Sequence, residues 1–265
     1  MTQLIHPDLS YQVRGVLLDV YNTLGPLLPE RFYEDAIAIG LETCQLRVET
    51  QKEFQVHYRH QQVGLYYTDL WIEDGKIVIE LKVDTAVSSL HKAQTISYLK
   101  VTNADLAILA NYGAASLQDQ RIPNFLRDKR PIFNWQPRPQ PQDLLYPDLC
   151  QAIFRACHQV HFTLGTGFLH RVYCRATRIE LRHCGLSHRY IKTVPITYQN
   201  HHIGNHQARL ILVEEKILLA TYALKGEQDR AIPQLRAQMR HLNIKLGLLA
   251  NFYGTTLTIT PVRLP

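Results

Sequence analysis

The sequence predicts an α/β fold that occurs twice in the chain, each time as a mixed β-sheet flanked by helices. Two observations predict it. Helical and strand-like periodicities follow one another in the same order in both halves, and short segments return 140 residues later with no gap between them. The returning segments include Pro7-Asp8-Leu9, Thr23-Leu24-Gly25 and Leu109-Ala110-Asn111, which recur as Pro147-Asp148-Leu149, Thr163-Leu164-Gly165 and Leu249-Ala250-Asn251.

Each copy is expected to contain two helices, three strands, a helix and a strand (ααβββαβ). In the first copy, apolar residues at helical spacing predict helices over residues 8–23 and about 30–44. The period then changes to two, which predicts strands near residues 54–58, 66–73 and 76–83, the last two joined by the hairpin signal Asp74-Gly75. A third helix over about 88–100 and a buried strand over 106–110 complete the copy.

The repeat sets the domain boundaries at residues 1–117 and 147–265. The segment 118–146 is rich in proline, with Pro123, Pro131, Pro137, Pro139 and Pro141, and is expected to be a stiff, extended linker. Phe133 and Trp135 within it are expected to dock on one of the domains.

Composition excludes several classes of protein. With 46% hydrophobic residues, each half can bury a core, which argues against disorder. No apolar run is long enough to cross a bilayer, and the N-terminus lacks the features of a signal peptide. The five cysteines contain no CxxC pair. We therefore expect a cytoplasmic protein without disulfides or membrane association.

The two copies disagree at the charged positions that could carry chemistry. Glu30, Asp69, Glu80 and Lys82 correspond to His170, Arg209, Ala220 and Tyr222. Features kept in both copies are expected to maintain the scaffold, so the ionic residues kept in one copy indicate where function should be sought.

Three of these residues are predicted to meet on one face of a hairpin. If Asp74-Gly75 is its two-residue loop, opposed residues have numbers that sum to 149, and Asp69 lies opposite Glu80. Opposed side chains share a face with Cβ atoms about 5 Å apart, and Lys82 projects on that face as well. The paired carboxylates would repel each other unless a divalent cation lay between them, and Mg²⁺ prefers such oxygen ligands.

The alternative interpretation is a solvent-facing ladder of charges in which Lys82 neutralises its neighbours, since surface ion pairs are common and weak. The apolar residues around the triplet argue against it, because they predict a strand buried on both faces. These are Ile77, Val78, Ile79, Leu81 and Val83. Charges in a buried strand need a partner, and a metal ion is a suitable one.

Together these residues resemble the GxxExxY proteins of the PD-(D/E)XK nuclease-like superfamily. The resemblance is carried by Glu30-Arg31-Phe32-Tyr33, Asp69, Glu80-Leu81-Lys82, Gln94 and Leu109-Ala110-Asn111-Tyr112-Gly113. It covers nearly all of residues 8–113 and, in eroded form, 148–254. It implies two tandem PD-(D/E)XK nuclease-like domains, the second degenerate.

The resemblance also implies roles for single residues. Asp69 and Glu80 would bind Mg²⁺ or Mn²⁺, and Lys82 would assist the hydrolytic water. Glu30, as a further metal ligand, and Gln94 would complete the site. One position departs from the family motif: its opening glycine is Leu27 here, whereas Gly167 is present in the second copy. Leu27 is expected to narrow or re-aim the entry to the helix that carries Glu30.

The second copy is strongly basic. Residues 1–113 hold 9 Lys/Arg and 14 Asp/Glu (−5), residues 114–146 hold 5 and 3 (+2), and residues 147–265 hold 15 and 6 (+9). Arg171, Arg175, Arg178 and Arg182 are expected to form one helical stripe, helped by Arg209 in the dismantled metal site. This charge is either an ordinary solvated surface or a face that holds a polyanion, and the repeat comparison favours the second.

Two hypotheses of function follow. The first is a Mg²⁺- or Mn²⁺-dependent nuclease, acting on DNA rather than RNA, in which the first copy cuts and the second holds the substrate. The alternative is a non-catalytic nucleic-acid-binding or scaffolding protein, an internal pseudo-dimer with a protein partner in a larger complex. Metal binding that depends on Asp69 and Glu80 discriminates between them. A zinc-dependent role for the histidine-rich second half rests on composition alone.

Overall fold

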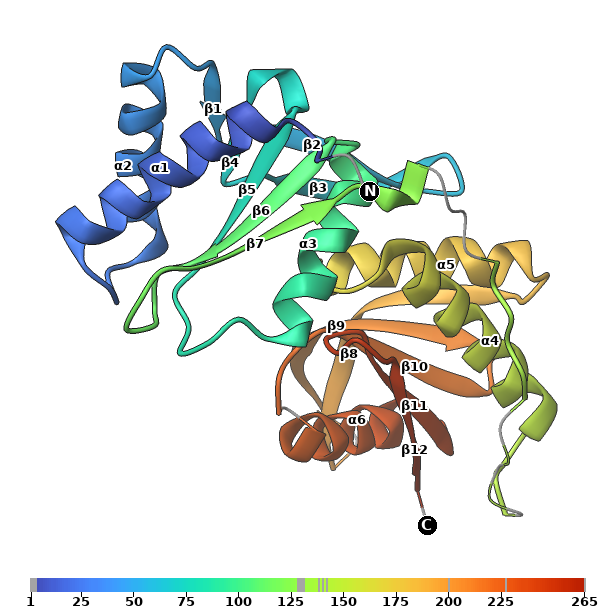
Figure 1. The fold of residues 1–265 in the computed structure, drawn as a ribbon. Coiled ribbons are helices and arrows are strands. Elements are labelled where there is room, and N and C mark those ends of the chain that lie inside the picture. The colour runs from blue at the N-terminus through green and yellow to red at the C-terminus, as the bar shows by residue number, and fades with distance from the viewer. Residues whose placement is uncertain are drawn as a thin grey trace. The chain divides into compact units, whose positions relative to one another are not determined.

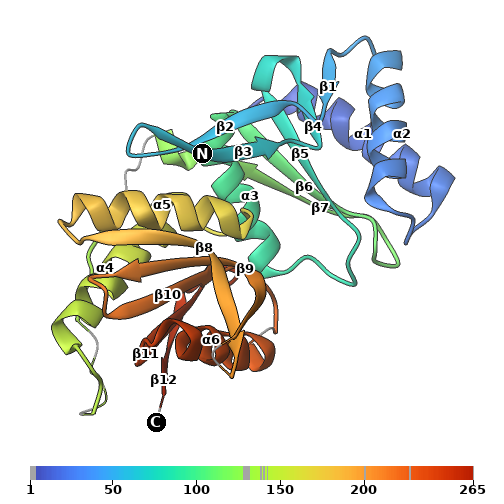
Figure 2. The same ribbon diagram turned by 180° about the vertical axis from the view of Figure 1, so that it is seen from behind.

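The computed structural model describes residues 4–127, 132–137, 139, 141, 143–199, 201–226 and 228–264. They divide into two compact units. Unit 1 comprises Met1–Val56 and Leu65–Pro131, and unit 2 comprises His57–Gly64 and Ile132–Pro265. Each unit contains a five-stranded mixed sheet flanked by helices (Figures 1 and 2), which confirms the predicted α/β class and its duplication.

The first copy contains more strands than the sequence predicts. Its elements are α1 (Pro7–Leu24), α2 (Glu30–Thr43), β1 (Val48–Thr50), β2 (Glu53–Tyr58), β3 (Gln61–Tyr67), β4 (Leu70–Ile72), β5 (Ile77–Lys82), α3 (Ser89–Thr102), β6 (Leu106–Asn111) and β7 (Gln118–Pro123). The sheet order is β1-β4-β5-β6-β7, with β2 and β3 as a separate pair. Only β5 and β6, which α3 connects, run parallel in this sheet.

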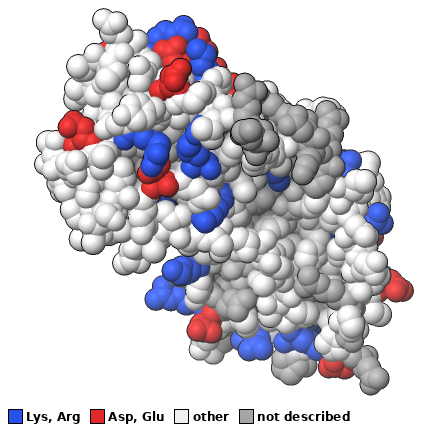
Figure 3. Space-filling model, in the orientation of Figure 1, with Lys and Arg blue, Asp and Glu red and all other residues white. Residues whose placement is uncertain are grey.

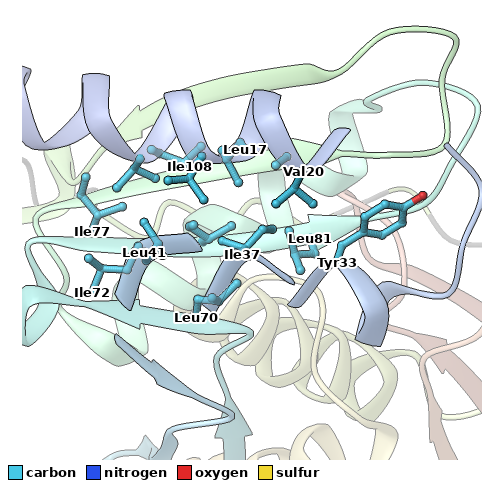
Figure 4. Close-up of a cluster of buried hydrophobic side chains, with 14 of the residues drawn as sticks. Leu17, Val20, Tyr33, Ile37, Leu41, Leu70, Ile72, Ile77, Leu81 and Ile108 are labelled. Carbon is cyan, nitrogen blue, oxygen red and sulfur yellow. The ribbon is translucent and has the colours of Figure 1, made fainter. Parts of the chain in front are cut away.

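Helices cover both faces of the unit 1 sheet. On one face, Leu17 and Val20 of α1 and Ile37 and Leu41 of α2 pack on alternate residues of β4, β5 and β6 (Figure 4). On the other face, Leu99 of α3 packs in a second cluster with neighbouring strand residues. The sheet is therefore buried on both sides, which explains the continuous apolar runs of β5 and β6.

Many of the repeated residues mark the ends of elements. α1 and α4 (Pro147–Leu164) both begin with proline in the first turn and an aspartate, Asp8 or Asp148, which favours a helix start. Both end at a glycine with positive φ, Gly25 (+72°) or Gly165 (+79°). The Tyr33 hydroxyl donates to the Gly25 carbonyl at 2.7 Å, and Tyr173 repeats this bond to Gly165 at 2.9 Å. These shared residues maintain the scaffold, as the repeat predicted.

The second copy keeps the same plan with longer strands. Its elements are α4, α5 (His170–His183), β8 (His188–Tyr198), β9 (His201–Val213), β10 (Ile217–Tyr222), α6 (Gln228–Leu242), β11 (Leu246–Asn251) and β12 (Thr258–Arg263). The sheet order is β12-β11-β10-β9-β8. β9 alone spans the positions that β3 and β4 occupy in the first copy, where the strand is interrupted at Thr68 and Asp69.

Pairing of the central strands differs by one residue between the copies. In unit 1, Ile72 pairs with Ile77, so the predicted sum of 149 is confirmed. In unit 2, Ile217 pairs with Val213, the sequence counterpart of Glu73. β8 and β1 show the same offset, since His188 pairs with Val213 whereas Val48 pairs with Ile72. Asp69 therefore corresponds in space to Leu210, and Arg209 corresponds to Thr68.

The predicted linker requires correction at its beginning. Residues 118–123 are not linker but β7, which pairs antiparallel with β6 and closes that edge of the sheet. Phe133 belongs to unit 2 and packs on Phe162 of α4, with ring centroids 5.4 Å apart, so its docking is confirmed. Pro131 and residues 128–130, 138, 140 and 142 lie outside the described residues.

The tip of the β2–β3 hairpin, residues 57–64, is part of unit 2. Tyr58 donates its hydroxyl to Glu180 of α5 at 2.6 Å, and the Arg59 guanidinium binds the same carboxylate at 2.5 and 3.1 Å. Glu180 is 3% exposed, so this buried charge is matched by two donors. No helix in the described part of the chain is long and apolar enough to cross a membrane.

Candidate active site

Asp69, Glu80 and Lys82 lie on the face of the unit 1 sheet that α3 covers. On β5, Ile77, Ile79 and Leu81 join the core beneath α1 and α2, so the alternate residues Glu80 and Lys82 point toward α3. Asp69 directly precedes β4, next to the last pair of the ladder, Leu70 with Ile79, and the Glu80 carboxylate acts on its charge. The predicted juxtaposition of these residues is therefore present. The connection after β4 differs, because a 3-10 turn (Glu73–Gly75) replaces the expected two-residue loop.

Hydrogen bonds hold the three side chains in place. Asp69 Oδ2 accepts from the backbone amide of Leu81 at 2.7 Å, beyond the last pair of the β4–β5 ladder. Lys82 Nζ donates to Glu80 Oε1 at 2.6 Å and to the Leu81 carbonyl at 2.7 Å. The interruption of the strand at Asp69 thus lets a carboxylate replace a strand carbonyl as the acceptor.

The electrostatic environment disfavours two charged carboxylates without a further cation. Burial raises the pKa of Asp69 well above its ordinary value, and the neighbouring Glu80 carboxylate raises it further. Burial also raises the pKa of Glu80, although Lys82 and Tyr66 oppose the shift. Burial disfavours charged Lys82, but the Glu80, Asp69 and Glu30 carboxylates outweigh this and raise its pKa. One lysine therefore faces more negative charge than it can neutralise.

Glu30 lies at the border of this group. It begins α2 and is exposed, and its charge acts on Asp69, Glu80 and Lys82. Across the described residues, no three His, Cys, Asp or Glu side chains are gathered closely enough to hold a metal ion. The structure thus brings together two carboxylates and a lysine, with Glu30 within electrostatic range.

Residues of α3 line the same region. Tyr98 stacks on Tyr66 with ring centroids 4.1 Å apart, and Tyr66 donates its hydroxyl to Glu80 Oε2 at 3.2 Å. The Lys82 and Glu30 charges act on His91. Gln94 is half-buried and lies three residues after His91 and four before Tyr98, so it shares their side of the helix.

Sequence reasoning missed Tyr66 and His91. His91 Nδ1 accepts from the Ser88 amide at 3.3 Å at the start of α3, and its Nε2 lies 3.3 Å from Asp84 Oδ2. The spacing from Gln94 could have indicated His91. Tyr66 could have been found as an aromatic residue on the strand that leads to Asp69.

Comparison with known proteins gives the family of the chain. The family model described as the PD-(D/E)XK nuclease superfamily matches residues 7–122 and again residues 147–261. The chain belongs to the PD-(D/E)XK nuclease superfamily. A solved structure described as "Crystal structure of SSO0001" is 23% identical with a TM-score of 0.26, and the match covers 43% of this chain and 61% of that one. No curated protein matches the chain.

The second PD-(D/E)XK domain has a different set of residues around a cavity. The counterparts of all five predicted site residues line one cavity of about 370 Å³ on the α6 side of the sheet: His170, Arg209, Ala220, Tyr222 and Gln234. The one-residue offset puts Leu210, rather than Arg209, in the strand position of Asp69. Arg209 nevertheless lines this cavity together with the counterparts of the other site residues, as expected, but it does so from the strand position before that of Asp69.

Most of the predicted arginine stripe of α5 is exposed to solvent. Arg171, Arg175 and Arg182 are exposed, and Arg178 is half-buried. Arg175 donates to the Val63 carbonyl at 3.3 Å, and Arg178 lies 4.7 Å from the centroid of the Tyr190 ring. Lys and Arg are interspersed with Asp and Glu on the face that Figure 3 shows, among the residues drawn in colour. The basic charge of this PD-(D/E)XK domain is thus distributed among packed and free side chains.

Proposed function

We propose that the protein is a Mg²⁺- or Mn²⁺-dependent nuclease that hydrolyses phosphodiester bonds at the Asp69–Glu80–Lys82 site of unit 1, in the cytoplasm. The observation that carries the proposal is the pair formed by the buried Glu80 and half-buried Asp69 carboxylates on one sheet face, both with raised pKa. The superfamily supports a nuclease-like fold, and the closer resemblance to GxxExxY proteins supports the assignment of roles.

The donor set fits a hard divalent cation. Asp69 and Glu80 would hold it through carboxylate oxygens, and Glu30 would add a further carboxylate. When bound, such a cation supplies a Lewis acid and lowers the pKa of bound water. It would also remove the repulsion between the two carboxylates, which are otherwise costly to bury in charged form.

The remaining residues have roles that follow from their contacts. Lys82 keeps its proton, because Glu80 lies 2.6 Å away, so it can stabilise negative charge or steady a water molecule by donating hydrogen bonds. Tyr66 orients the Glu80 carboxylate through its hydroxyl. Gln94 would orient water or contact the phosphate backbone from α3.

The second domain would hold the nucleic acid. The net charge of +9 over residues 147–265 attracts a polyanion. The exposed Arg171 and Arg182 are accessible to phosphates. Arg175, Arg178 and Arg209 would contribute to the same electrostatic field. We propose DNA rather than RNA as the substrate.

A cleavage assay tests the proposal. The purified protein is incubated with single- and double-stranded DNA and RNA, with Mg²⁺, with Mn²⁺ or with EDTA. Cleavage is expected with DNA and metal, and Asp69→Asn or Lys82→Ala should lower it at least about 100-fold. Arg189→Gln, which removes an exposed charge far along the chain from this site, is the matched control. Cleavage that survives both site substitutions overturns the assignment.

A second function is compatible with the small number of carboxylates at the site. Within the described residues, no three His, Cys, Asp or Glu side chains are placed so that they could hold a metal ion, as in a binding or scaffolding protein that contacts a protein partner. Calorimetry separates the two functions. If neither Mg²⁺ nor Mn²⁺ binds in a manner that depends on Asp69 and Glu80, the non-catalytic function is the one to adopt.

A further inference from the structure

The cavity of unit 2 is open and large enough to hold a small molecule. Its volume of about 370 Å³ lies within the range of about 300–1,000 Å³ that small-molecule sites occupy. Leu210 and Ala220 stand where the first copy has Asp69 and Glu80, so the carboxylates are gone and the space is open. All the residues that line the cavity belong to the second domain, and none of them is a proposed metal ligand.

The rim of this cavity is basic. Arg209 of β9 and Arg230 of α6 are both exposed and both line it. No acidic side chain is among the described residues that line the cavity, and within that part of the chain neither arginine forms an ion pair. Two cations without a counter-ion beside a partly enclosed space attract an anion.

His170 positions the Arg209 guanidinium at this rim. It lies at the N-terminus of α5 and is hydrogen-bonded to Arg209 through Nε2. Burial lowers the pKa of His170, and Arg209 and Arg171 lower it further, so the ring is neutral and accepts from the guanidinium. This bond fixes one side of Arg209 and leaves its other N–H groups available to a ligand.

The floor of the cavity is apolar with one buried amide. Ala208, Leu210, Leu235 and Leu249 form the apolar part. Gln238 of α6 is 7% exposed and lines the cavity. A side-chain amide both donates and accepts hydrogen bonds, so Gln238 is suited to a polar group that enters the cavity.

We propose that this cavity binds a nucleoside monophosphate group, with its phosphate between Arg209 and Arg230 and its base over the apolar floor against Gln238. The basic rim fits the phosphate, and the floor with a single amide fits a flat base whose edge carries donors and acceptors. The group could be a free nucleotide or the end of a strand. In the second case the inference rests on the nucleic-acid role proposed above, and the cavity would position a strand end.

Isothermal titration calorimetry of the full chain tests this inference. The probes are the four nucleoside 5′-monophosphates in ribo and deoxy form, adenosine, inorganic phosphate, and a 5′-phosphorylated oligothymidine. Nucleotides are expected to bind more tightly than adenosine or phosphate alone, since each of these keeps only half of the contacts. Tighter binding of the oligonucleotide than of the free nucleotide identifies a strand end as the ligand, and the reverse identifies the free nucleotide.

Substitutions locate the binding. Arg209→Gln should weaken nucleotide binding about 10- to 100-fold, and Gln238→Leu about 5- to 10-fold, from the loss of a charged and a neutral hydrogen bond respectively. Arg189→Gln is the matched control, because Arg189 is an exposed strand arginine paired with Glu215 away from the cavity. It should leave the affinity unchanged. Gln238→Leu should not lower the melting temperature, which separates a binding role from a structural one.

Several outcomes overturn the inference. It fails if no nucleotide binds, if Arg189→Gln weakens binding as much as Arg209→Gln, or if phosphate binds as tightly as the nucleotides. Its fate is separable from that of the proposed nuclease. Nucleotide binding without cleavage contradicts only the proposed nuclease activity, whereas cleavage without nucleotide binding contradicts only the proposed nucleotide site.

Discussion

At the scale of single residues, Leu27 adopts a backbone conformation that its side chain disfavours. Its φ is +70°, in the left-handed region, and its side chain is 69% exposed. Gly167 at the same position of the second copy has φ +104°. The left-handed region costs a residue with a Cβ about 1–2 kcal/mol, whereas glycine adopts it freely. Glycine therefore fits this turn without strain, whereas the backbone of Leu27 is strained in it.

This strain leads to a prediction for two matched variants. Leu27→Gly should leave the free energy of unfolding unchanged or raise it by up to about 1 kcal/mol, because little packing is lost from an exposed side chain. Gly167→Leu should lower it by at least about 1 kcal/mol, because the turn in the second copy then becomes strained. Urea unfolding measures both. A large decrease in the free energy of unfolding of Leu27→Gly would show that the leucine side chain stabilises the turn.

Asp69 provides a prediction about pH. Its folded-state pKa is raised, so the stability it contributes is present below its unfolded pKa of about 3.9 and is lost as pH rises through the folded value. Asp69→Asn keeps an oxygen to accept from the Leu81 amide but carries no charge. In EDTA, the variant should therefore melt at a higher temperature than the wild type at pH 8, and the difference should shrink toward pH 4.

Added Mg²⁺ completes this test. It should raise the melting temperature of the wild type at pH 8 and leave that of Asp69→Asn unchanged, since the ion binds the charged carboxylates of the folded state. An equal rise in both proteins would place the ion elsewhere.

At the scale of elements, the hairpin of β4 and β5 shows what the sequence could and could not reveal. Asp74-Gly75 and the alternating residues predicted the pairing, because register is set by turn chemistry and by the buried face. In the second copy Glu214-Glu215 replaces Asp74-Gly75, so the turn signal is lost, and the pairing there differs by one residue. Val213 is buried and stays in the strand, whereas its counterpart Glu73 leaves the strand and accepts from the Arg47 amide at 2.8 Å. The size of the difference in pairing could not be read from the sequence.

The contacts of α5 give a prediction for Glu180. Burial would raise its pKa, but the hydrogen bonds from Arg59 and Tyr58 lower it below the ordinary value. Its contribution to stability is therefore present above the unfolded pKa of about 4.3 and is lost as pH falls through the folded value. Glu180→Ala should cost about 2–3 kcal/mol at pH 7, since a buried charge pair is broken while the partly exposed Arg59 regains water.

Urea unfolding at several pH values checks this prediction, with Glu215→Ala as the control. Glu215 forms an exposed ion pair with Arg189, so its loss should cost no more than about 1 kcal/mol. A cost for Glu180→Ala that does not decrease in acid would mean that its charge is not what stabilises α5.

At the scale of the whole molecule, comparing the copies separates scaffold from site. Pro7, Gly25 and Tyr33 recur because they end helices and fix turns, and these roles could be read from residue type and spacing. The pairing of Asp69 with Glu80 followed from the hairpin. Tyr66 and His91 were not predicted, although the strand that leads to Asp69 and the helical spacing from Gln94 indicate them, because their contacts depend on how β3 and α3 pack around Glu80. The cavity of the second domain was not predicted either, because it depends on how α5, α6 and the strands pack together.

The division of charge between the copies gives the last prediction, which concerns salt. If the second domain holds nucleic acid through phosphates, the logarithm of affinity should fall linearly with the logarithm of salt concentration, by about 0.9 per phosphate contact for duplex DNA. Replacing the exposed Arg171 and Arg182 by glutamine should flatten this slope by about 1–2 and weaken binding at low salt. Lys82→Ala should leave the slope unchanged, because Lys82 is bound to Glu80 and acts on one bond rather than on the whole polyanion. Fluorescence anisotropy at salt concentrations between 50 and about 300 mM would measure it. Equal slopes for the wild type and the double variant would mean that these arginines do not contact phosphates, and that the charge of +9 is an ordinary solvated surface.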